Sequence, residues 1–191
     1  MNSVIFVAGV YGVGKSTLCN KLSSATGIPA FSAGDLISDI NGETYGRNKV
    51  VKNAKSNQDI LISAVDAKLE KCSHFLLAGH FCIVGKDNEV ELLPEYVFSK
   101  LHLSQIILLE ANALRIAENI NGRDHRTYPV QTLERLIACE RSQAQRVAKE
   151  LKIPLTIHSM RFNRSDEEAL VNLLLGGHED ESTPGHKHRN S

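Results

Sequence analysis

The chain has 191 residues, 42% of them hydrophobic, and its 22 Lys and Arg side chains balance 22 Asp and Glu side chains. This length and apolar content suit one α/β domain, which buries a substantial core without disulfides or a structural metal. A formal net charge of zero gives no overall basic field and so disfavours a nucleic-acid partner. No apolar run approaches the ~18 residues of a membrane-spanning helix, so no membrane association is expected.

Four cysteines, Cys19, Cys72, Cys82 and Cys139, show no C-x-x-C spacing. Each lies in an apolar or helical stretch, where a thiol packs as a small hydrophobic side chain. The N-terminal apolar run is short, has no basic residue before it and leads directly into a glycine-rich loop, which indicates a first strand rather than a signal peptide. These features predict a reduced, cytoplasmic protein.

The first predicted element is a strand over residues 3–8, which is apolar almost throughout, as in a parallel sheet covered on both faces. A glycine-rich loop follows, and Leu18, Leu22 and Ala25 then recur at helical intervals until Gly27, which predicts a helix over 15–25. The same periodicities predict strands at 29–32, 74–78, 105–110 and 155–158 and helices at 59–69, 94–101, 112–120 and 130–152.

Strands that alternate with helices predict an α/β fold with a five-stranded parallel sheet flanked by helices, which binds ligands outside the carboxyl ends of its strands. Much of the stretch from 36 to 56 is polar and interrupted by glycine, which indicates a mobile insertion. Residues 176–191 have no apolar side chain to bury and are predicted to form a disordered polar tail. The folded domain is therefore expected to span residues 1–175.

Residues 9–16, Gly-Val-Tyr-Gly-Val-Gly-Lys-Ser, match the phosphate-binding pattern G-x-x-x-x-G-K-S. In this P-loop the glycines let backbone amides face phosphate oxygens at a helix N-terminus, the lysine reaches the β- and γ-phosphates, and the serine ligates magnesium. The predicted strand before it and helix after it distinguish it from a chance glycine-rich turn. The guanine-selecting Asn-Lys-x-Asp arrangement is absent, which favours ATP over GTP. We therefore expect ATP and Mg²⁺ to bind at Gly9, Tyr11, Gly12, Val13, Gly14, Lys15, Ser16 and Thr17.

The P-loop followed by Ser32-Ala33-Gly34-Asp35 resembles the start of a nucleoside monophosphate kinase, and more closely that of archaeal-type adenylate kinases and related bacterial AAA-type ATP-binding proteins. The resemblance implies a P-loop nucleotide kinase fold with a short arginine-bearing lid. It also implies a kinase that transfers the γ-phosphate of ATP to a nucleoside monophosphate. It spans about residues 3–160 and is carried further by Gly79-His80, Leu93-Pro94-Glu95, Ile107-Leu108-Leu109-Glu110-Ala111 and Arg123-Asp124-His125-Arg126.

Arg123 and Arg126 lie in a short polar segment between two predicted helices, which is typical of a lid. Guanidinium groups suit bidentate contact with phosphate, and a closing lid brings them onto the transferring phosphoryl group while it expels water. The alternative is a solvated turn with a local ion pair. The resemblance favours the catalytic interpretation.

Two side chains follow predicted strands and face the expected phosphate site. Asp35 comes after the second strand, where its carboxylate can hold magnesium through a water or position the acceptor. It also suits the N-cap of a helix over 36–40, and the two roles are compatible. His80 follows the third strand and can sense the γ-phosphate or orient an attacking group. A histidine at such a place is also often a hydrogen-bonded structural residue.

The expected binding region for the phosphoryl acceptor is polar and basic. Arg47, Lys49 and Lys52 lie in the insertion that covers the acceptor in kinases of this type, and they are candidates to neutralise an acceptor phosphate. A charge run is more often a solvated face. Asn57 and Gln58 lie nearby and have the same two interpretations.

The chain departs from the family pattern in three places. Ala78 occupies the position near the end of the third strand where the family has a magnesium-organising aspartate, so Asp35 takes over this task or transfer is slowed. The arginine often found on the helix after the fourth strand is missing near Asn119. Residues 36–38 contain none of the cations that many such kinases place after Gly-Asp, and Arg47 is the candidate replacement.

The first functional hypothesis is an ATP-dependent kinase for a nucleoside monophosphate or a similar small acceptor. In it Lys15, Arg123, Arg126 and Asp35 are catalytic, Ser16 and Asp35 hold the metal, and Arg47, Gln58 and His80 contact the acceptor. The second is an ATP-dependent switch or slow ATPase that acts on a protein partner. The third, a kinase for nucleic-acid ends, is disfavoured by the neutral net charge.

Overall fold

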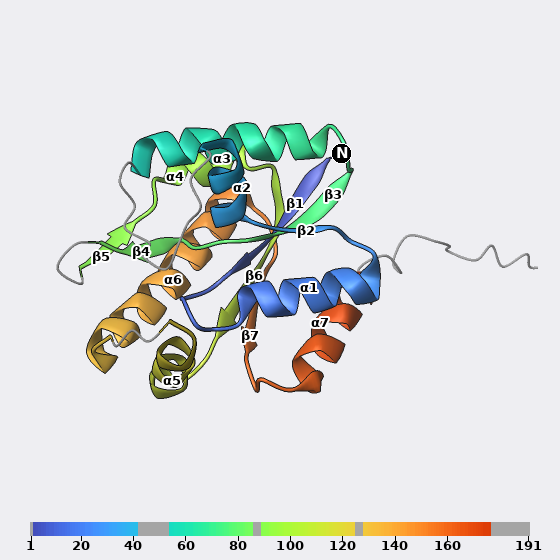
Figure 1. The fold of residues 1–191 in the computed structure, drawn as a ribbon. Helices are drawn as coiled ribbons and strands as arrows, with labels where there is room; N and C mark the ends of the chain where they lie inside the picture. The colour runs from blue at the N-terminus through green and yellow to red at the C-terminus, as the bar shows by residue number, and fades with distance from the viewer. Residues whose placement is uncertain (1, 42–53, 86–88, 125–127, 177–191) are drawn as a thin grey trace, which may run out of the picture.

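The computed structural model describes residues 2–41, 54–85, 89–124 and 128–176, and Figure 1 shows a central sheet with helices on both faces. The predicted mobile insertion, with Arg47, falls largely outside the described residues, as do Arg126 and all but the first residue of the predicted tail. In the part of the chain that is described, no helix has the length and apolarity needed to cross a bilayer.

The central sheet contains five parallel strands in the order β2-β3-β1-β6-β7, which confirms the predicted fold class. Each strand agrees with its prediction to within two residues at either end, because the buried strands are the most continuously apolar parts of the sequence. The strands are β1 (Ser3–Ala8), β2 (Ala30–Ser32), β3 (His74–Ala78), β6 (Leu103–Glu110) and β7 (Leu155–Ser159).

The helices form two layers around this sheet (Figure 1). On one face the first and last helices pack side by side, and on the other α3 packs against α4 and α4 against α6. The bounds are α1 (Lys15–Thr26), α2 (Ala33–Asn41), α3 (Ala54–Leu69), α4 (Glu95–Lys100), α5 (Ala113–Asp124), α6 (Val130–Leu151) and α7 (Arg164–Gly176).

Three aromatic rings close the core beneath the carboxyl end of β3. The ring centroid of Phe81 lies 5.1 Å from that of Phe6 and 4.6 Å from that of Phe98. Gly79 is essential to this packing, since a Cβ atom there would lie 2.6 Å from a carbon of the Phe6 ring. The end of β3 is thereby fixed against the core, which fixes the position of His80 directly after it.

A small antiparallel hairpin, β4 (Cys82–Val84) and β5 (Val90–Leu92), was not predicted. Its strands have three residues each, too few for an alternating pattern to be recognised. The hairpin packs against α6, so it extends the molecule beyond the carboxyl end of β3.

Helix α7 was also missing from the sequence interpretation, although Leu170 and Leu174 form a buried stripe along it.

Two predicted boundaries are wrong in ways that affect the site. Helix α2 begins at Ala33 rather than at residue 36, so Asp35 lies within its first turn and is not its N-cap. The Ser32 hydroxyl oxygen instead accepts a hydrogen bond from the Asp35 N–H at 3.4 Å. Helix α5 continues to Asp124, so the backbone of Arg123 lies in its last turn and not in a loop. A lid that includes Arg123 therefore has to begin with a helix end.

Candidate nucleotide-binding site

The P-loop connects β1 to α1 at the carboxyl edge of the sheet, as predicted. Gly14 has a φ of 96° and a ψ of 13°, a left-handed conformation that suits glycine and lets α1 start at Lys15. Gly12 has a φ of 79°, and a Cβ atom there would come within 2.7 Å of Ile120 Cγ1 on α5. The loop is therefore held close against α5 and turns its backbone toward the N-terminus of α1, where anions bind.

Lys15 is almost buried, with 9% of its surface exposed. Its ammonium group donates hydrogen bonds to the carbonyl oxygens of Gly9 at 2.7 Å and Val10 at 3.0 Å. The cation is thus held inside the loop beside the expected phosphate position. The side chain of Val13 is completely buried in the core, so this residue can contribute only its backbone to phosphate binding.

Asn119 braces the P-loop from α5. Its Nδ2 atom donates a hydrogen bond to the Gly12 carbonyl oxygen at 2.9 Å. The family resemblance implies an arginine near this position, whereas the amide here acts on the loop backbone. This contact was not foreseen, because a sequence does not show which residue of a helix faces a distant loop.

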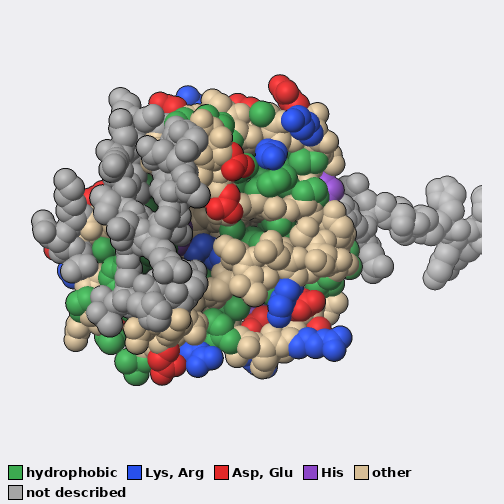
Figure 2. Space-filling view, viewed as in Figure 1, with side chains coloured by type: hydrophobic (Ala, Val, Ile, Leu, Met, Phe, Trp, Pro, Cys, Tyr) green, Lys and Arg blue, Asp and Glu red, His purple; other side chains and the backbone are tan. Residues whose placement is uncertain are grey.

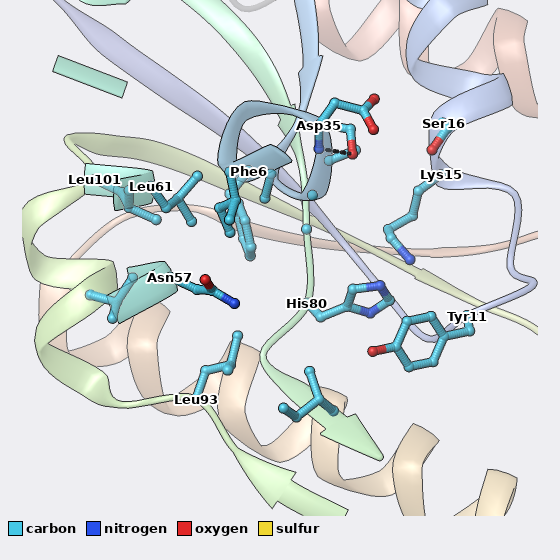
Figure 3. A pocket seen from close by; sticks show the side chains of 18 of the residues that line it. Phe6, Tyr11, Lys15, Ser16, Asp35, Asn57, Leu61, His80, Leu93 and Leu101 are labelled. Atoms are coloured by element: carbon cyan, nitrogen blue, oxygen red, sulfur yellow. Dashed lines mark hydrogen bonds between the residues drawn. The ribbon is translucent and has the colours of Figure 1, made fainter. Parts of the chain in front are cut away.

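A cavity of about 290 Å³ opens beside the P-loop and brings together most of the predicted side chains (Figure 3). One end is polar and is bordered by Lys15, Ser16, Asp35 and His80. The opposite wall is apolar, and Figure 2 shows hydrophobic and acidic side chains around the hollow on this face. The residues of this wall are Phe6, Ile37, Leu61, Ile83, Leu93, Val97, Phe98 and Leu101.

Two amide side chains from the start of α3 border the same cavity. Asn57 and Gln58 are 8% and 6% exposed. Figure 3 shows the Asn57 amide pointing into the space between the apolar wall and His80. The Gln58 carbonyl oxygen accepts no hydrogen bond from any described residue. A buried amide oxygen of this kind costs free energy unless a hydrogen-bond donor reaches it.

His80 belongs to a stack that joins the P-loop to α6. Its ring centroid lies 4.2 Å from that of Tyr11, and its Nδ1 atom lies 3.7 Å from the Glu140 Oε1 atom. The same oxygen accepts hydrogen bonds from the N–H groups of Phe81 at 2.9 Å and Cys82 at 3.1 Å. Burial, with smaller contributions from Tyr128 and Glu140, raises the pKa of Tyr11 well above its usual value, so its phenol stays neutral.

Glu140 was missed by sequence reasoning, although a signal for it exists. It is 1% exposed and lies on the buried stripe of α6 between Leu136 and Ala144. A carboxylate at helical spacing on an apolar stripe requires an internal partner, because burial of an unpaired charge is costly.

A second cavity, of about 360 Å³, lies on the other side of the P-loop. It shares Gly12, Gly14 and Thr17 with the first cavity and extends to Asn119 and Phe162. The P-loop therefore lies between two hollows, one reaching toward α2 and α3 and the other toward α5 and the segment after β7.

Asp166 holds the segment between β7 and α7 in shape. It is 2% exposed and accepts hydrogen bonds from the N–H groups of Arg161 at 3.0 Å and Asn163 at 3.2 Å. Its Oδ1 atom is also hydrogen-bonded to the Nε2 atom of His158 at 2.8 Å. Burial alone would raise the pKa of Asp166, but the bonds from Arg161, His158 and Asn163 outweigh it and place the pKa below the usual value. The outer wall of the second cavity is thereby fixed, with the Arg115 guanidinium 5.3 Å from the centre of the Phe162 ring.

The described residues offer hard oxygen ligands for a cation but no complete protein cage. Ser16 on α1 and Asp35 on α2 border the same polar end of the cavity (Figure 3). Ala78, at the end of β3, supplies no charge. Among the residues that the structure describes, no group of three or more His, Cys, Asp or Glu side chains is placed to bind a metal. Phosphate oxygens would have to complete the coordination of Mg²⁺ here.

Several predicted site residues cannot be placed in this geometry. Arg47 and Arg126 lie outside the described residues, as does the side chain of Arg123.

Comparison with known proteins agrees with this arrangement. The family described as "AAA domain" matches residues 8–137. The adenylate kinases of Thermoplasma volcanium and Thermoplasma acidophilum are 27% and 29% identical over 115 residues, which are 59% of this chain and 62% of each enzyme. The chain thus matches less than two thirds of the length of these relatives.

Solved structures share the fold at low identity. A shikimate kinase from Acinetobacter baumannii superposes with a TM-score of 0.62 at 12% identity, covering 94% of this chain and 97% of that enzyme. A sugar kinase from Janibacter sp. HTCC2649 gives a TM-score of 0.58 at 16% identity, covering 91% and 95%. With its P-loop, parallel sheet and sequence relatives, the chain belongs to the AAA domain family and is a P-loop protein of the nucleoside monophosphate kinase-like type.

Proposed function

We propose that this chain is a kinase that transfers the γ-phosphate of ATP to a nucleoside monophosphate or a similar small acceptor. The observation that carries the proposal is one cavity bordered both by the P-loop with Lys15 and by a separate wall built from α2, α3 and α4. A hydrolase needs only the first of these two parts. A transferase needs both, because donor and acceptor must meet in line.

The donor lies across the P-loop. Backbone amides of the loop and the Lys15 ammonium hold the β- and γ-phosphates. The adenine ring occupies the second cavity, between Asn119 on α5 and Phe162 after β7. Aromatic and amide side chains suit a planar base that presents both a π-face and hydrogen-bonding edges.

Magnesium fits the oxygen atoms present. Ser16 and Asp35 would hold the ion together with phosphate oxygens, and it would supply positive charge against the phosphates. Because Ala78 replaces a carboxylate at the end of β3, Asp35 has a larger share of this task.

The acceptor occupies the first cavity. The flat face of its base lies against the apolar wall near Leu61 and Leu101, and the polar edge of the base lies at Asn57 and Gln58. The Gln58 oxygen receives a hydrogen bond from this edge, which gives that buried atom a partner. Arg47 neutralises the acceptor phosphate. The sequence relatives named as adenylate kinases support a nucleotide as this acceptor.

In the transfer, an oxygen of the acceptor phosphate forms a bond to the γ-phosphorus while the bond to the β,γ-bridging oxygen breaks. ADP leaves with the electron pair of that bond, and the acceptor becomes a diphosphate. Lys15 and the lid arginines, Arg123 and Arg126, neutralise the charge on the transferring group.

An acceptor panel tests the proposal. Purified protein is incubated with γ-labelled ATP, Mg²⁺ and each nucleoside monophosphate, shikimate or a hexose in turn, and labelled products are separated from free phosphate. We expect one class of acceptor to give labelled product faster than hydrolysis. Release of free phosphate alone with every acceptor would refute the kinase.

A second function, an ATP-dependent switch or slow ATPase that acts on a protein partner, is favoured by one observation. Ala78 leaves the end of β3 without the carboxylate that the family uses to organise magnesium. Tight ATP binding with no acceptor-dependent turnover, together with ATP-dependent capture of a partner, would favour this function. Oligonucleotides added to the panel test the third hypothesis, a kinase for nucleic-acid ends.

A further inference from the structure

A buried carboxylate lies directly behind the proposed reaction centre. Glu140 projects from α6 and is 1% exposed, which for a charged side chain requires strong compensation. Its Oε1 atom accepts two backbone hydrogen bonds, from Phe81 at 2.9 Å and Cys82 at 3.1 Å. Its Oε2 atom accepts none from the described residues. Two amide bonds to one oxygen compensate only part of the cost of burying this charge.

On its side toward the cavity, the Glu140 carboxylate faces the imidazole of His80. The His80 Nδ1 atom lies 3.7 Å from Glu140 Oε1. On the side of the P-loop the His80 ring packs against the Tyr11 ring, and the two ring centroids are 4.2 Å apart. Figure 3 shows the His80 ring between the phenol of Tyr11 and the open cavity, on the side of Lys15. A carboxylate at this distance favours the protonated, positively charged form of an imidazole.

We infer that Glu140 is a positioning residue that holds the His80 ring against Tyr11 and favours its imidazolium form, so that its outer edge donates a hydrogen bond to a phosphate oxygen in the cavity. Only the consequence for turnover rests on the proposed kinase function. The contact between Glu140 and His80 is independent of that function.

The other charged and titratable groups around His80 act in known directions. Lys15 on α1 and Asp35 on α2 border the same cavity; the lysine disfavours a second positive charge, whereas the carboxylate favours one. Tyr11, whose phenol is neutral, contributes packing and no charge. The thiols of Cys82 on β4 and Cys139 on α6 lie beside Glu140, with their sulfur atoms 2.9 Å apart. Glu140 is an anion that lies against the His80 ring.

The direct test is an NMR titration of the His80 ring in three proteins. The His80 signal is assigned by its loss in His80→Ala, and its pKa is measured in the wild type, in Glu140→Gln and in Glu140→Asp. Glu140→Gln keeps an oxygen for the Phe81 and Cys82 N–H groups but removes the charge. We expect it to lower the pKa of His80 by about one unit, with a smaller decrease in Glu140→Asp, which keeps the charge.

A matched control is Glu150→Gln, which removes a carboxylate from an exposed site on the same helix. It should leave the His80 titration unchanged. A His80 pKa that is the same in the wild type, Glu140→Gln and Glu140→Asp would overturn the inference. If Glu140→Gln does not fold, the comparison of Glu140→Asp with the wild type still tests the inference. The shorter side chain moves the charge away from the His80 ring, which must also lower the measured pKa of His80.

The consequence in turnover is tested separately with the best acceptor from the panel. If the imidazolium is required, turnover declines as the pH rises through the His80 pKa, and Glu140→Gln moves this decline to lower pH by about the same one unit. In the His80→Ala background, Glu140→Gln should cause no further shift. A purely structural role would instead add its loss in both backgrounds.

The two failures can be told apart. A shifted His80 titration with no transfer to any acceptor refutes the kinase but leaves the pairing of Glu140 with His80 intact. Transfer with an unshifted titration refutes the pairing alone.

Discussion

At the scale of single residues, Lys15 has the largest expected effect on nucleotide binding. Its ammonium group is held by the Gly9 and Val10 carbonyl oxygens, so the cation is in place before any phosphate arrives. Replacement by alanine removes the charge that the β- and γ-phosphates meet. We predict that Lys15→Ala weakens ATP binding at least tenfold, measured by calorimetry, which is about 1.4 kcal/mol or more.

The control for this variant is Lys149→Ala, which removes the same charge from an exposed position near the end of α6. It should bind ATP as the wild type does. Unchanged ATP affinity in Lys15→Ala would contradict the P-loop interpretation under every functional hypothesis.

Asp166 gives a prediction about pH and stability. Its pKa is lower in the folded protein than in the unfolded chain, so its stabilisation is complete above an unfolded pKa of about 3.9 and is lost as the pH falls toward the folded pKa. Asp166→Asn should lower the free energy of unfolding at pH 7 by about 1 to 3 kcal/mol. The difference from the wild type should shrink as the pH falls from about 4 toward the folded pKa, as urea unfolding at each pH would show.

A difference that stays constant across this pH range would mean that the charge of Asp166 contributes nothing. Glu168→Gln is the control, because Glu168 is an exposed carboxylate on the same helix. Glu168→Gln should change the free energy of unfolding little, both at pH 7 and at low pH.

At the scale of elements, the P-loop and α5 form one unit. Gly12 lies so close to Ile120 that a methyl group fits only if α5 or the loop moves. Gly12→Ala should therefore weaken ATP binding and lower the free energy of unfolding by about 1 to 3 kcal/mol. The double variant Gly12→Ala/Ile120→Ala should recover part of the loss in ATP binding, because alanine lacks the Cγ1 atom that makes the nearest contact.

If Ile120→Ala does not restore ATP binding, the positive φ of Gly12 rather than the contact with Ile120 accounts for the loss. Gly122→Ala provides a comparison on the same helix, since a Cβ atom there has no neighbour within 4 Å. It should leave ATP binding unchanged.

At the scale of the whole molecule, two cavities on either side of one P-loop predict how ligands affect stability. A ligand at a hundred times its dissociation constant stabilises the native state by about 2.7 kcal/mol. Under the proposed function, a dinucleotide with two adenosines joined by a polyphosphate would fill both cavities, whereas ATP would fill one. We predict a larger increase in melting temperature with the dinucleotide than with ATP when each is present at the same concentration.

A larger shift with ATP than with the dinucleotide would show that the first cavity does not accept a nucleotide. Inorganic triphosphate, which reaches neither cavity beyond the P-loop, is the control and should give the smallest shift.

The sheet was predictable from sequence because β1, β3 and β6 are buried on both faces and read as continuous apolar runs. The P-loop was predictable because its glycines and lysine follow a fixed spacing. The hairpin of β4 and β5 was not, since three-residue strands have no usable periodicity.

The contacts of single residues could be predicted only in part, because many of them depend on tertiary structure. Lys15, Ser16, Asp35, Gln58 and His80 were named from sequence, and all of them border the first cavity. Glu140 was not named, and Asn119 was named only for a missing arginine, because each acts on a segment far from it in the chain. Asp166 was not named either, although its partners lie within eight residues of it. The position of Asp35 in α2 was misjudged because a helix can start with Ala-Gly, residues that carry no capping side chain.

The strand order also determines how this chain can fold. β1 is the first strand to be synthesised, yet it lies in the middle of the sheet, where Val7 pairs with Ala78 on one side and Ile107 on the other. The phosphate-binding loop is attached to the end of this strand. A nascent chain that ends before β6 therefore exposes one unpaired edge of β1, so the P-loop gains its final support only after β6 has been made.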